Sequence, residues 1–379
     1  MKIIYCLFDS SLPGGMQRTI SCKGNYLADV LGYDVSIITT DRGDKENFYH
    51  FSDKIHFTDF QINYLELNQF SWWKRFWAQQ KKRKAHKKQL TAYLFQHKPD
   101  IVISTYTYEF TLLPSIKDGS KKIGEIHFSK QYNQIENKNK KQSFLNKIFS
   151  RLAEKRKYLY IAKYDKFVVL TKNDLNNWKP YPNVESIYNP LPFYPKETAI
   201  LDTKRVISVG RLALQKGYDM LIEAWEQVYA VYPDWKLDIF GKGKDYDFLH
   251  QLIFSKKLEQ TITINPLTDN IMSEYLNSSV YVMSSRYEGF PMVLIEALAF
   301  GLPCVSFDCP DGPSEAITNN VDGFLVENGN VQKLAEKIML LIENEDTRRK
   351  MGEKAKENAR RFSPDIIMKQ WDRLFQGIY

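Results

Sequence analysis

The stretch SSRYEGFPMVLIEALAFG, residues 284–301, decides how this sequence is expected to fold. An apolar run at residues 280–283 precedes it and is typical of a β-strand. From Pro291 onward no helix breaker follows until Gly301. Proline is favoured at a first helical position, and glycine just past a last turn. The sequence therefore predicts a strand, a tight turn and a helix that begins near Pro291 and is closed by Gly301.

The start of this predicted helix combines an anion-binding end with two carboxylates. The free amides around Met292 to Leu294 would point back toward the loop that carries Glu288. Such an end attracts phosphate through unpaired donors and aligned peptide dipoles. Glu296 lies about one and a half turns further along, where its carboxylate would accept hydrogen bonds from a ribose diol. The pattern fits a sugar nucleotide, although any Glu-Gly turn before a helix gives the same spacing.

A second loop carries two cations and follows the predicted strand at residues 205–209. Arg211 and Lys216 straddle this loop, which leads into a predicted helix. Fixed cations at this place would neutralise the charge that gathers on a departing diphosphate. The alternative is that both residues are ordinary surface charges with no role in binding or catalysis.

Several of these motifs resemble one enzyme family. Glu288 and Glu296, separated by seven residues, are similar to the signature of glycosyltransferase family 4, retaining enzymes of the GT-B fold. The order Gly210-Arg211 and then Lys216-Gly217, and the Gly14-Gly15 pair after the first predicted strand, also resemble this family. The resemblance implies catalytic contacts from His127, Arg211, Lys216 and Glu288, and donor contacts from Gly14, Gly15, Leu267, Gly289, Phe290, Met292, Val293, Leu294 and Glu296.

His127 ends a predicted strand at residues 122–129. A lone histidine is more often structural than functional, so the residue type alone leaves its role open. In family 4 enzymes a histidine commonly ends a strand of the first domain and faces the sugar. The resemblance therefore implies that His127 contacts the transferred sugar or the acceptor.

The alternation of strands and helices predicts the fold class. Residues 3–8 and 33–40 flank a helical segment, which gives an opening βαβ unit. The three-glycine spacing of dinucleotide-binding folds is missing, which argues against a nicotinamide enzyme. The resemblance implies an α/β GT-B fold, with two Rossmann-like parallel-sheet domains facing a central cleft. The expected parts are an acceptor-side domain at 1–195, a nucleotide-sugar-binding domain at 196–361 and a C-terminal helix at 362–379 that crosses back to the first domain.

Charge is unevenly spread along the 379 residues, whose net charge is +8. Residues 1–199 contain 32 Lys and Arg against 19 Asp and Glu, a balance of +13. The remaining residues contain 21 against 26, a balance of −5. A basic first half suggests an anionic partner, which would be a membrane surface, a nucleic acid or a phosphorylated substrate.

The most basic segment lies between Glu66 and Asp100, where there is no acidic residue. Its cations crowd beside clustered aromatic side chains, namely Trp72, Trp73, Phe76 and Trp77. This combination suits the headgroup layer of an anionic membrane. An alternative, equally compatible with the sequence, is that the aromatic residues pack into the core and the lysines form a solvated helix face. Nucleic acid is not expected as a partner, because no base-reading motif accompanies these charges.

Composition limits the other classes of protein and site. No apolar run approaches the ~20 residues of a membrane span, and the N-terminal run is too short for a signal peptide, so a cytoplasmic location is expected. The cysteines have no metal-type spacing, and reduced thiols are expected at Cys6, Cys22, Cys304 and Cys309. Asp245 and Asp247 resemble a metal-binding pair but are expected to open a helix. No metal cofactor is expected, since Arg211 and Lys216 would supply the positive charge.

The expected activity is transfer of a sugar from a nucleotide sugar, with retention, to a saccharide acceptor. The sequence of residues 309–315, CPDGPSE, is similar to the corresponding motif of family members that use UDP-linked galactose-type sugars, including N-acetylgalactosamine. The basic, Trp-rich first half favours a lipid-linked acceptor in envelope polysaccharide synthesis, on the inner face of the cell membrane. Two alternatives remain open: a GT-B-type nucleotide-sugar epimerase, and a non-catalytic basic protein that binds membrane or nucleic acid.

Overall fold

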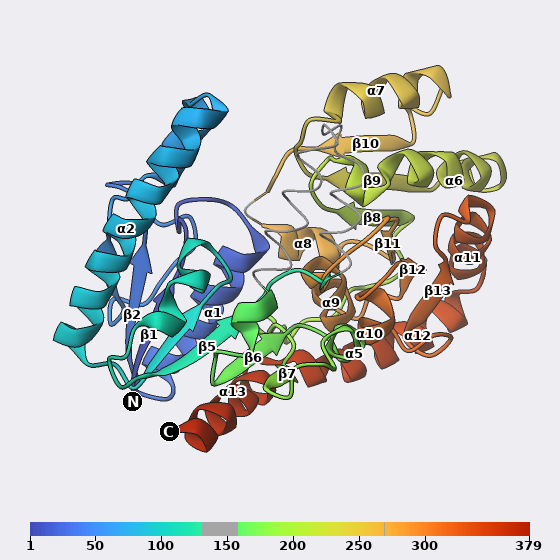
Figure 1. The fold of residues 1–379 in the computed structure, drawn as a ribbon. Coiled ribbons are helices and arrows are strands. Elements are labelled where there is room, and N and C mark those ends of the chain that lie inside the picture. The colour runs from blue at the N-terminus through green and yellow to red at the C-terminus, as the bar shows by residue number, and fades with distance from the viewer. Residues whose placement is uncertain (131–157, 269) are drawn as a thin grey trace. The chain divides into compact units, whose positions relative to one another are not determined.

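We describe a computed structural model of the chain, which covers residues 1–130, 158–268 and 270–379 (Figure 1). These residues form two compact units, one of Met1–Pro192 with Pro364–Tyr379 and the other of Phe193–Ser363. Each unit contains a parallel β-sheet with helices, so the predicted α/β class with two Rossmann-like domains is confirmed. The sequence from Lys130 to Lys157 is polar and basic and predicts a loop with a surface helix, but apart from Lys130 it lies outside the described residues.

The sheet of the first unit has, among the described residues, seven parallel strands in the order β3-β2-β1-β4-β5-β6-β7. The strands are β1 (Lys2–Cys6), β2 (Asp34–Thr39), β3 (His56–Asp59), β4 (Ile101–Ser104), β5 (Lys121–Glu125), β6 (Lys166–Val169) and β7 (Val184–Ser186). The described α-helices of this unit are α1 (Gly15–Asp29), α2 (Trp72–His97), α5 (Lys172–Asn177) and α13 (Pro364–Ile378). The predicted opening βαβ unit is therefore present as β1, α1 and β2.

Both faces of the first sheet are covered, as the apolar sequence of β1 requires. Ile4 belongs to the core cluster that contains Leu90 and Leu94 of α2. Ile3, its neighbour on the opposite face, belongs to the cluster that contains Trp371 of α13. Successive strand residues point to opposite faces, so this one strand joins both layers of the core.

The sheet of the second unit has, among the described residues, six parallel strands in the order β10-β9-β8-β11-β12-β13. The strands are β8 (Arg205–Val209), β9 (Lys236–Phe240), β10 (Ile262–Asn265), β11 (Val280–Met283), β12 (Cys304–Asp308) and β13 (Gly323–Glu327). The helices are α6 (Tyr218–Val231), α7 (Tyr246–Ser255), α8 (Ile271–Leu276), α9 (Met292–Ala299), α10 (Pro313–Ala316), α11 (Val331–Glu343) and α12 (Glu345–Ala359).

Strand order determines where each sheet can bind a ligand. In the second sheet β8 lies between β9 and β11, so successive connections leave β8 in opposite directions. In the first sheet β1 lies in the same way between β2 and β4. Loops diverge at such switch points, and open parallel sheets bind ligands at the carboxyl ends of the strands there. Ligands are therefore expected at the loops after β8 and β11 in the second unit, and at those after β1 and β4 in the first.

The deciding stretch folds as strand, turn and helix, as the sequence predicts. The helix α9 begins at Met292, and Pro291 takes the N-cap position with extended backbone angles. The prediction of a helix that begins near Pro291 is therefore confirmed, since helix boundaries are defined only to within a residue or two. Gly301 lies just past the last turn with a φ of +78°, as expected of a residue that closes a helix.

Candidate active site

The loops after β8 and β11 bring together three polar side chains at the switch point of the second sheet. The Nζ atom of Lys216 lies 2.6 Å from Oε1 of Glu288. The same carboxylate oxygen accepts a hydrogen bond of 2.6 Å from the hydroxyl of Ser285. The Lys216 side chain is 17% exposed and that of Glu288 is 7% exposed. A half-buried cation thus lies beside a buried carboxylate whose orientation is fixed by a neighbouring hydroxyl.

Backbone contacts between the two loops hold this pair in place. Gly217 follows Lys216 with a φ of +63°, and a Cβ there would overlap the carbonyl oxygen of Ser284. The hydroxyl of Ser284 donates in turn to the carbonyl of Lys216 at 2.9 Å. Only glycine fits both the backbone angle and the close approach, so the Lys-Gly pair in the sequence has a structural reason.

Arg286 provides a second connection between the same loops. Its guanidinium forms two hydrogen bonds, of 2.8 and 2.6 Å, to the carboxylate of Asp219, in the first turn of α6. Its backbone amide donates to the carbonyl of Gln215 at 2.8 Å. Such two-point contacts between Arg and carboxylate fix geometry as well as charge. The loop after β11 is therefore attached to the loop after β8 on both sides of Lys216.

The amino end of α9 offers fewer free amides than the sequence predicts. The amide of Leu294 donates to the carbonyl of Pro291 at 3.0 Å, so it is already paired. Among the described residues, Met292 and Val293 remain as helix-start amides without a hydrogen-bond acceptor. Both residues are half-buried, whereas Leu294 is buried in the core. An anion at this end would meet two amides of the predicted three.

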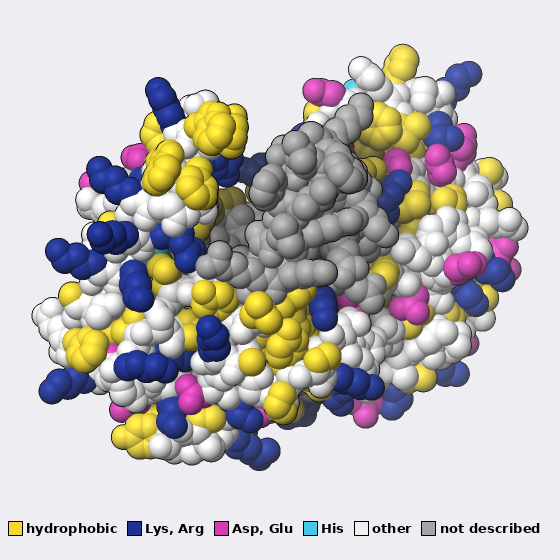
Figure 2. Space-filling view, in the orientation of Figure 1, with side chains coloured by type: hydrophobic (Ala, Val, Ile, Leu, Met, Phe, Trp, Pro, Cys, Tyr) yellow, Lys and Arg dark blue, Asp and Glu magenta, His cyan; other side chains and the backbone are white. Residues whose placement is uncertain are grey.

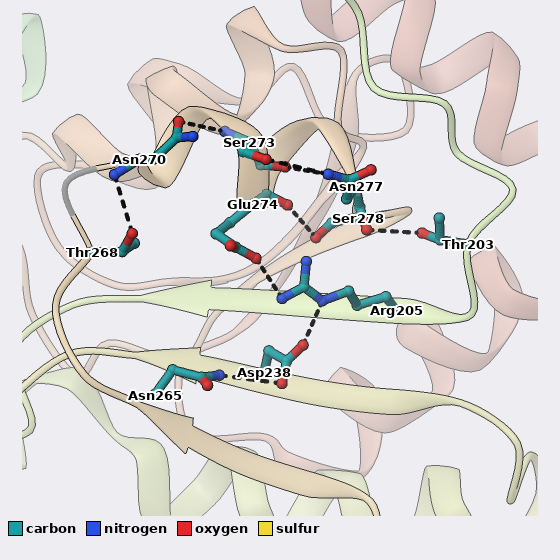
Figure 3. A network of polar contacts seen from close by, with 10 residues as sticks. All are labelled: Thr203, Arg205, Asp238, Asn265, Thr268, Asn270, Ser273, Glu274, Asn277 and Ser278. Atoms are coloured by element: carbon teal, nitrogen blue, oxygen red, sulfur yellow. Dashed lines mark hydrogen bonds and ion pairs between the residues drawn. The ribbon is translucent and has the colours of Figure 1, made fainter.

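Glu296 lies one to two turns inside α9 and is buried. The hydroxyl of Tyr275, on α8, lies 3.5 Å from its Oε2 atom. Figure 3 shows how α8 is anchored: Arg205 at the start of β8 pairs with Asp238 on β9, and at 2.6 Å with Glu274 on α8. The same network extends through Asn and Ser side chains along α8. The position of Glu296 beside a fixed tyrosine suits a carboxylate that holds a ligand hydroxyl.

The other predicted residues of the second unit are placed less closely around the pair. Arg211 is exposed, and its guanidinium donates to Oε1 of Gln215 at 3.2 Å rather than to Glu288. Leu267 is exposed in the loop that follows β10. Gly289 is half-buried, whereas Phe290 is buried with its ring 5.5 Å from that of Phe362. Phe290 would therefore meet a donor through its backbone, while Arg211 is free to turn toward one.

His127 lies in the first unit, just beyond β5, and is buried in a charged cluster. Its Nε2 atom lies 3.4 Å from Oε1 of Glu125, a distance too long for a firm hydrogen bond. Within the described residues neither ring nitrogen has a hydrogen-bond partner. Burial lowers the pKa of His127 to about 4, with Glu125 opposing the shift and Lys23 adding to it. Burial thus favours the neutral form of the imidazole.

Lys23 and α13 hold the carboxylate beside His127. The ammonium of Lys23 contacts both oxygens of Glu125, at 2.6 and 2.7 Å, and is fully buried. It also lies 3.4 Å from the ring centroid of Trp371 on α13. Burial lowers the pKa of Lys23 to about 8, and the Glu125 carboxylate opposes that shift. The C-terminal helix thus covers a buried ion pair that positions the end of β5.

The Gly14-Gly15 pair lies where α1 begins, beyond the carboxyl end of β1. Gly14 is the N-cap residue of α1 and Gly15 its first residue. Among the described residues no atom lies within 4 Å of the place where a Cβ on Gly15 would sit. The local fold therefore does not require glycine at that position, and the backbone there is open to another molecule.

The first unit also contains a cavity of about 920 Å³. It is open to solvent on one side and is lined by residues that follow β1 and start α1, by the short helices η1 (Tyr64–Gln69) and η2 (Tyr108–Thr111), and by α2. Its walls include Phe8, Met16, Leu65, Phe76, Arg83 and Tyr108. Aromatic and apolar walls with a few polar side chains, among which Arg83 is the one arginine of the described lining, are typical of a site for a small organic ligand.

Two negative findings concern the described residues alone. No group of three or more His, Cys, Asp or Glu side chains within them is arranged to hold a metal ion. Searched in the same way, they contain no helix that is both long and apolar enough to cross a membrane.

Comparison with known proteins decides the family. The family model described as glycosyl transferases group 1 matches residues 192–358. An uncharacterized glycosyltransferase of Haemophilus influenzae is 30% identical over 374 residues, which are 98% of this chain and 98% of that protein. The chain belongs to the group 1 glycosyltransferases.

Two further proteins resemble this glycosyltransferase. The amylovoran biosynthesis glycosyltransferase AmsD of Erwinia amylovora is 32% identical over 234 residues, 59% of this chain and 66% of that protein. The crystal structure of Anabaena HepE in complex with UDP and glucose has a TM-score of 0.74 at 18% identity, over 99% of both chains. At that identity the likeness shows the shared GT-B fold alone.

Some residues of this candidate site were not predicted from the sequence. Ser285 contacts Glu288 directly, and Cys309, whose pKa is raised by burial and then by Glu288, is a second neighbour. A Cβ on Gly312 would lie 3.1 Å from Cβ of Glu288 and 2.9 Å from Cδ of Pro291. Gly312 lies within the CPDGPSE motif, which resembles the family and could have indicated it. Nothing in the sequence distinguishes Ser285 from any other loop serine.

Proposed function

We propose that this glycosyltransferase moves a sugar from a UDP-sugar to a saccharide acceptor, with retention of configuration. The proposed sugar is of the galactose or N-acetylgalactosamine type, as the wording of residues 309–315 suggests. The proposed acceptor is carried on a lipid, and the reaction contributes to envelope polysaccharide at the inner face of the cell membrane. AmsD, named for amylovoran biosynthesis, and HepE, solved with UDP and glucose, support this assignment by similarity.

The observation that carries the proposal is the ion pair of Lys216 and Glu288 at the switch point of the second sheet. A donor diphosphate beside Lys216 would be in contact with its ammonium and, at the start of α9, with the amides of Met292 and Val293. Glu288 would then lie next to the sugar that the diphosphate carries. Arg211, exposed in the same loop, would add a second cation to the diphosphate.

The proposed chemistry needs no covalent intermediate on the protein. The bond between the anomeric carbon and the diphosphate oxygen breaks while the acceptor oxygen attacks the same face of the sugar. The acceptor's proton passes to the departing phosphate oxygen, so UDP leaves with the bonding electron pair. Negative charge grows on the diphosphate during this step, and fixed cations stabilise it most where water is excluded. Lys216 and Arg211 supply that stabilisation, and no metal cofactor is required.

Each remaining residue of the proposed site has one contact. Glu296 accepts hydrogen bonds from the ribose hydroxyls, and Leu267 meets the base beside the loop that follows β10. The backbone of Gly289 and Phe290 contacts the donor, with Leu294 supporting the start of α9. In the first unit, the family resemblance assigns Gly14 and Gly15 to donor binding and His127 to the sugar or the acceptor.

Transfer and retention are tested in one experiment. Purified protein is incubated with UDP-galactose, UDP-N-acetylgalactosamine, UDP-glucose or UDP-N-acetylglucosamine and with lipid-linked saccharides extracted from bacterial membranes. The proposal predicts acceptor-dependent release of UDP from one donor, and a product whose NMR spectrum shows the α-anomer. A β-anomer would contradict retention, and conversion of the donor sugar without acceptor would instead indicate the epimerase.

A further inference from the structure

The helix α2 carries an exposed aromatic end that the donor site does not explain. It has eight Lys and Arg residues and no acidic residue. Its second half is attached to the core through buried His86, Leu90 and Leu94. Its first turns are exposed instead, with exposed fractions of 66% for Trp72, 62% for Trp73, 52% for Phe76 and 70% for Trp77. The alternative in which these rings pack into the core is therefore wrong.

The amino-terminal half of α2 projects away from the sheet of its unit (Figure 1). Figure 2 shows hydrophobic side chains gathered over the free end of this helix, with Lys and Arg side chains beside and below them. The rings contact one another: the centroids of Trp72 and Trp73 are 3.5 Å apart, and those of Phe76 and Trp77 are 5.6 Å apart. Clustered exposed rings of this kind mark a contact surface.

Helical periodicity divides α2 into separate faces. Trp73, Trp77, Lys81, Lys84 and Lys88 recur at intervals of four, four, three and four residues, so they lie on one face, here called the docking stripe. All five are exposed. A neighbouring face contributes walls to the cavity of the first unit, through Phe76, Gln79, Gln80 and Arg83. Further along the helix, the side that carries Gln79 and Arg83 continues into buried His86, Leu90 and Leu94.

The charge of the stripe favours one occupant. Two indoles occupy its free end, and three lysines follow over the next turns, without any carboxylate on the helix to oppose them. Indoles settle at the boundary between lipid headgroups and acyl chains, while nearby lysines bind anionic headgroups. The order along the stripe, rings first and cations after, matches a helix end that enters the interface of an anionic bilayer.

We propose that the docking stripe of α2 binds the surface of an anionic lipid bilayer. The indoles of Trp73 and Trp77 enter the interface, and Lys81, Lys84 and Lys88 contact the headgroups. A further consequence rests on the proposed function: the cavity on the adjacent face of α2 then receives the headgroup of an acceptor that remains in the membrane. Arg83, whose guanidinium donates to Thr111 at 2.9 Å, is the cation available there for an acceptor phosphate.

The test is sedimentation of the full chain with phosphatidylcholine vesicles, alone or mixed with phosphatidylglycerol. Wild-type protein should bind the mixed vesicles and lose that binding as salt is raised. A triple variant, Lys81→Gln with Lys84→Gln and Lys88→Gln, should bind about a hundredfold more weakly, at about fivefold for each lysine. The double variant Trp73→Ala with Trp77→Ala should weaken binding even where the lysines are intact.

A matched control removes the same charge elsewhere. Lys333, Lys350 and Lys369 are exposed on other helices, and replacing all three by Gln should leave vesicle binding unchanged. An equal loss of vesicle binding in the control and stripe variants would overturn the proposal. Failure of wild-type protein to bind either vesicle type would overturn it as well. Binding of a mixed-sequence RNA in place of vesicles, lost in the stripe variant alone, would also overturn it. UDP-induced thermal stabilisation of the stripe variants reports the donor site separately, so failure of one claim is not mistaken for failure of the other.

Discussion

The ammonium of Lys216 and the carboxylate of Glu288 meet at 2.6 Å although the residues are 72 positions apart. One follows β8 and the other follows β11, and the parallel order of the sheet makes these two loops neighbours. The pair holds a lysine in place that would otherwise extend into solvent. In the proposed mechanism the diphosphate takes the place of part of this contact, so the cation is already positioned when the donor arrives.

Replacing Lys216 by Ala should lower kcat by roughly a hundredfold to a thousandfold, as expected when one stabiliser of transition-state charge is removed. A control is available in Lys256, whose Nζ lies 2.6 Å from Glu226 on the outside of the second unit. Lys256→Ala should leave kcat unchanged. Steady-state release of UDP in the presence of acceptor measures both variants, and full activity of Lys216→Ala would refute the proposed role of the lysine.

Added chelator should leave the transfer rate unchanged. Arg211, Lys216 and the amides at the start of α9 supply the positive charge in the proposed mechanism, so no divalent ion has to bridge the diphosphate. The rate is compared before and after dialysis against EDTA, and again after addition of Mg²⁺ or Mn²⁺. Loss of activity that one of these ions restores would contradict the mechanism.

Substitution of Gly217 by Ala should destabilise the second unit and distort the site. The residue has a φ of +63°, and a Cβ would also overlap the carbonyl of Ser284. We expect a loss of more than about 2 kcal/mol, because the overlap adds to the usual cost of the left-handed conformation. Gly329 has a φ of +84° with open space around it, so Gly329→Ala should cost about 1 kcal/mol. Equal shifts in melting temperature for the two variants would show that the close approach to Ser284 is absent.

Stability should fall as the pH is lowered below about 6.5, partly because of His127. Its pKa is lowered to about 4 by burial, so between these values the unfolded chain binds a proton that the folded chain does not. The contribution is complete above pH ~6.5 and is lost progressively toward pH ~4, with a limit of about 3 kcal/mol. His86, whose pKa is lowered to about 4 by burial and by Arg83, acts in the same direction.

The variant His127→Gln isolates this contribution. Its melting temperature should depend less steeply on pH between 4 and 6.5 than that of wild-type protein. Exposed His50 provides the control, and His50→Gln should keep the wild-type slope. An unchanged slope in His127→Gln would mean that the imidazole is charged in the folded protein.

The sequence predicted which residues follow each strand better than it predicted which of these residues contact one another. Lys216 and Glu288 were predicted because each lies in a short loop after an apolar run, where a parallel sheet gathers its ligand-binding residues, and because the family resemblance implies a role for both. Their contact could not be predicted, since it depends on β8 and β11 being neighbours. The amide of Leu294 is not free for a ligand, because it donates to the carbonyl of Pro291. Whether it does so depends on the exact residue at which the helix begins, and local propensity does not determine that residue.

The features of the first unit were less visible in the sequence. The cavity is lined by residues from several separate elements, and Tyr108 and Met16 carry no motif of their own. The aromatic residues of α2 fitted either a core or a surface, because their spacing suits both. The contacts of Lys23 with Glu125 and Trp371 join segments that are far apart in the chain, and a buried lysine cannot be recognised from sequence alone.

The most direct test of the donor site is the melting temperature of wild-type, Lys216→Ala and Glu288→Gln protein with UDP, GDP or ADP. A ligand that binds only the folded state raises its stability by about 2.7 kcal/mol at a hundredfold excess over Kd, which is several degrees for a domain of this size. The account predicts stabilisation of wild-type protein and of Glu288→Gln by UDP, and a smaller shift for Lys216→Ala, which keeps the other proposed contacts to the nucleotide. No shift of the wild-type protein with any nucleotide, or an equal shift with UDP in Lys216→Ala, would contradict it.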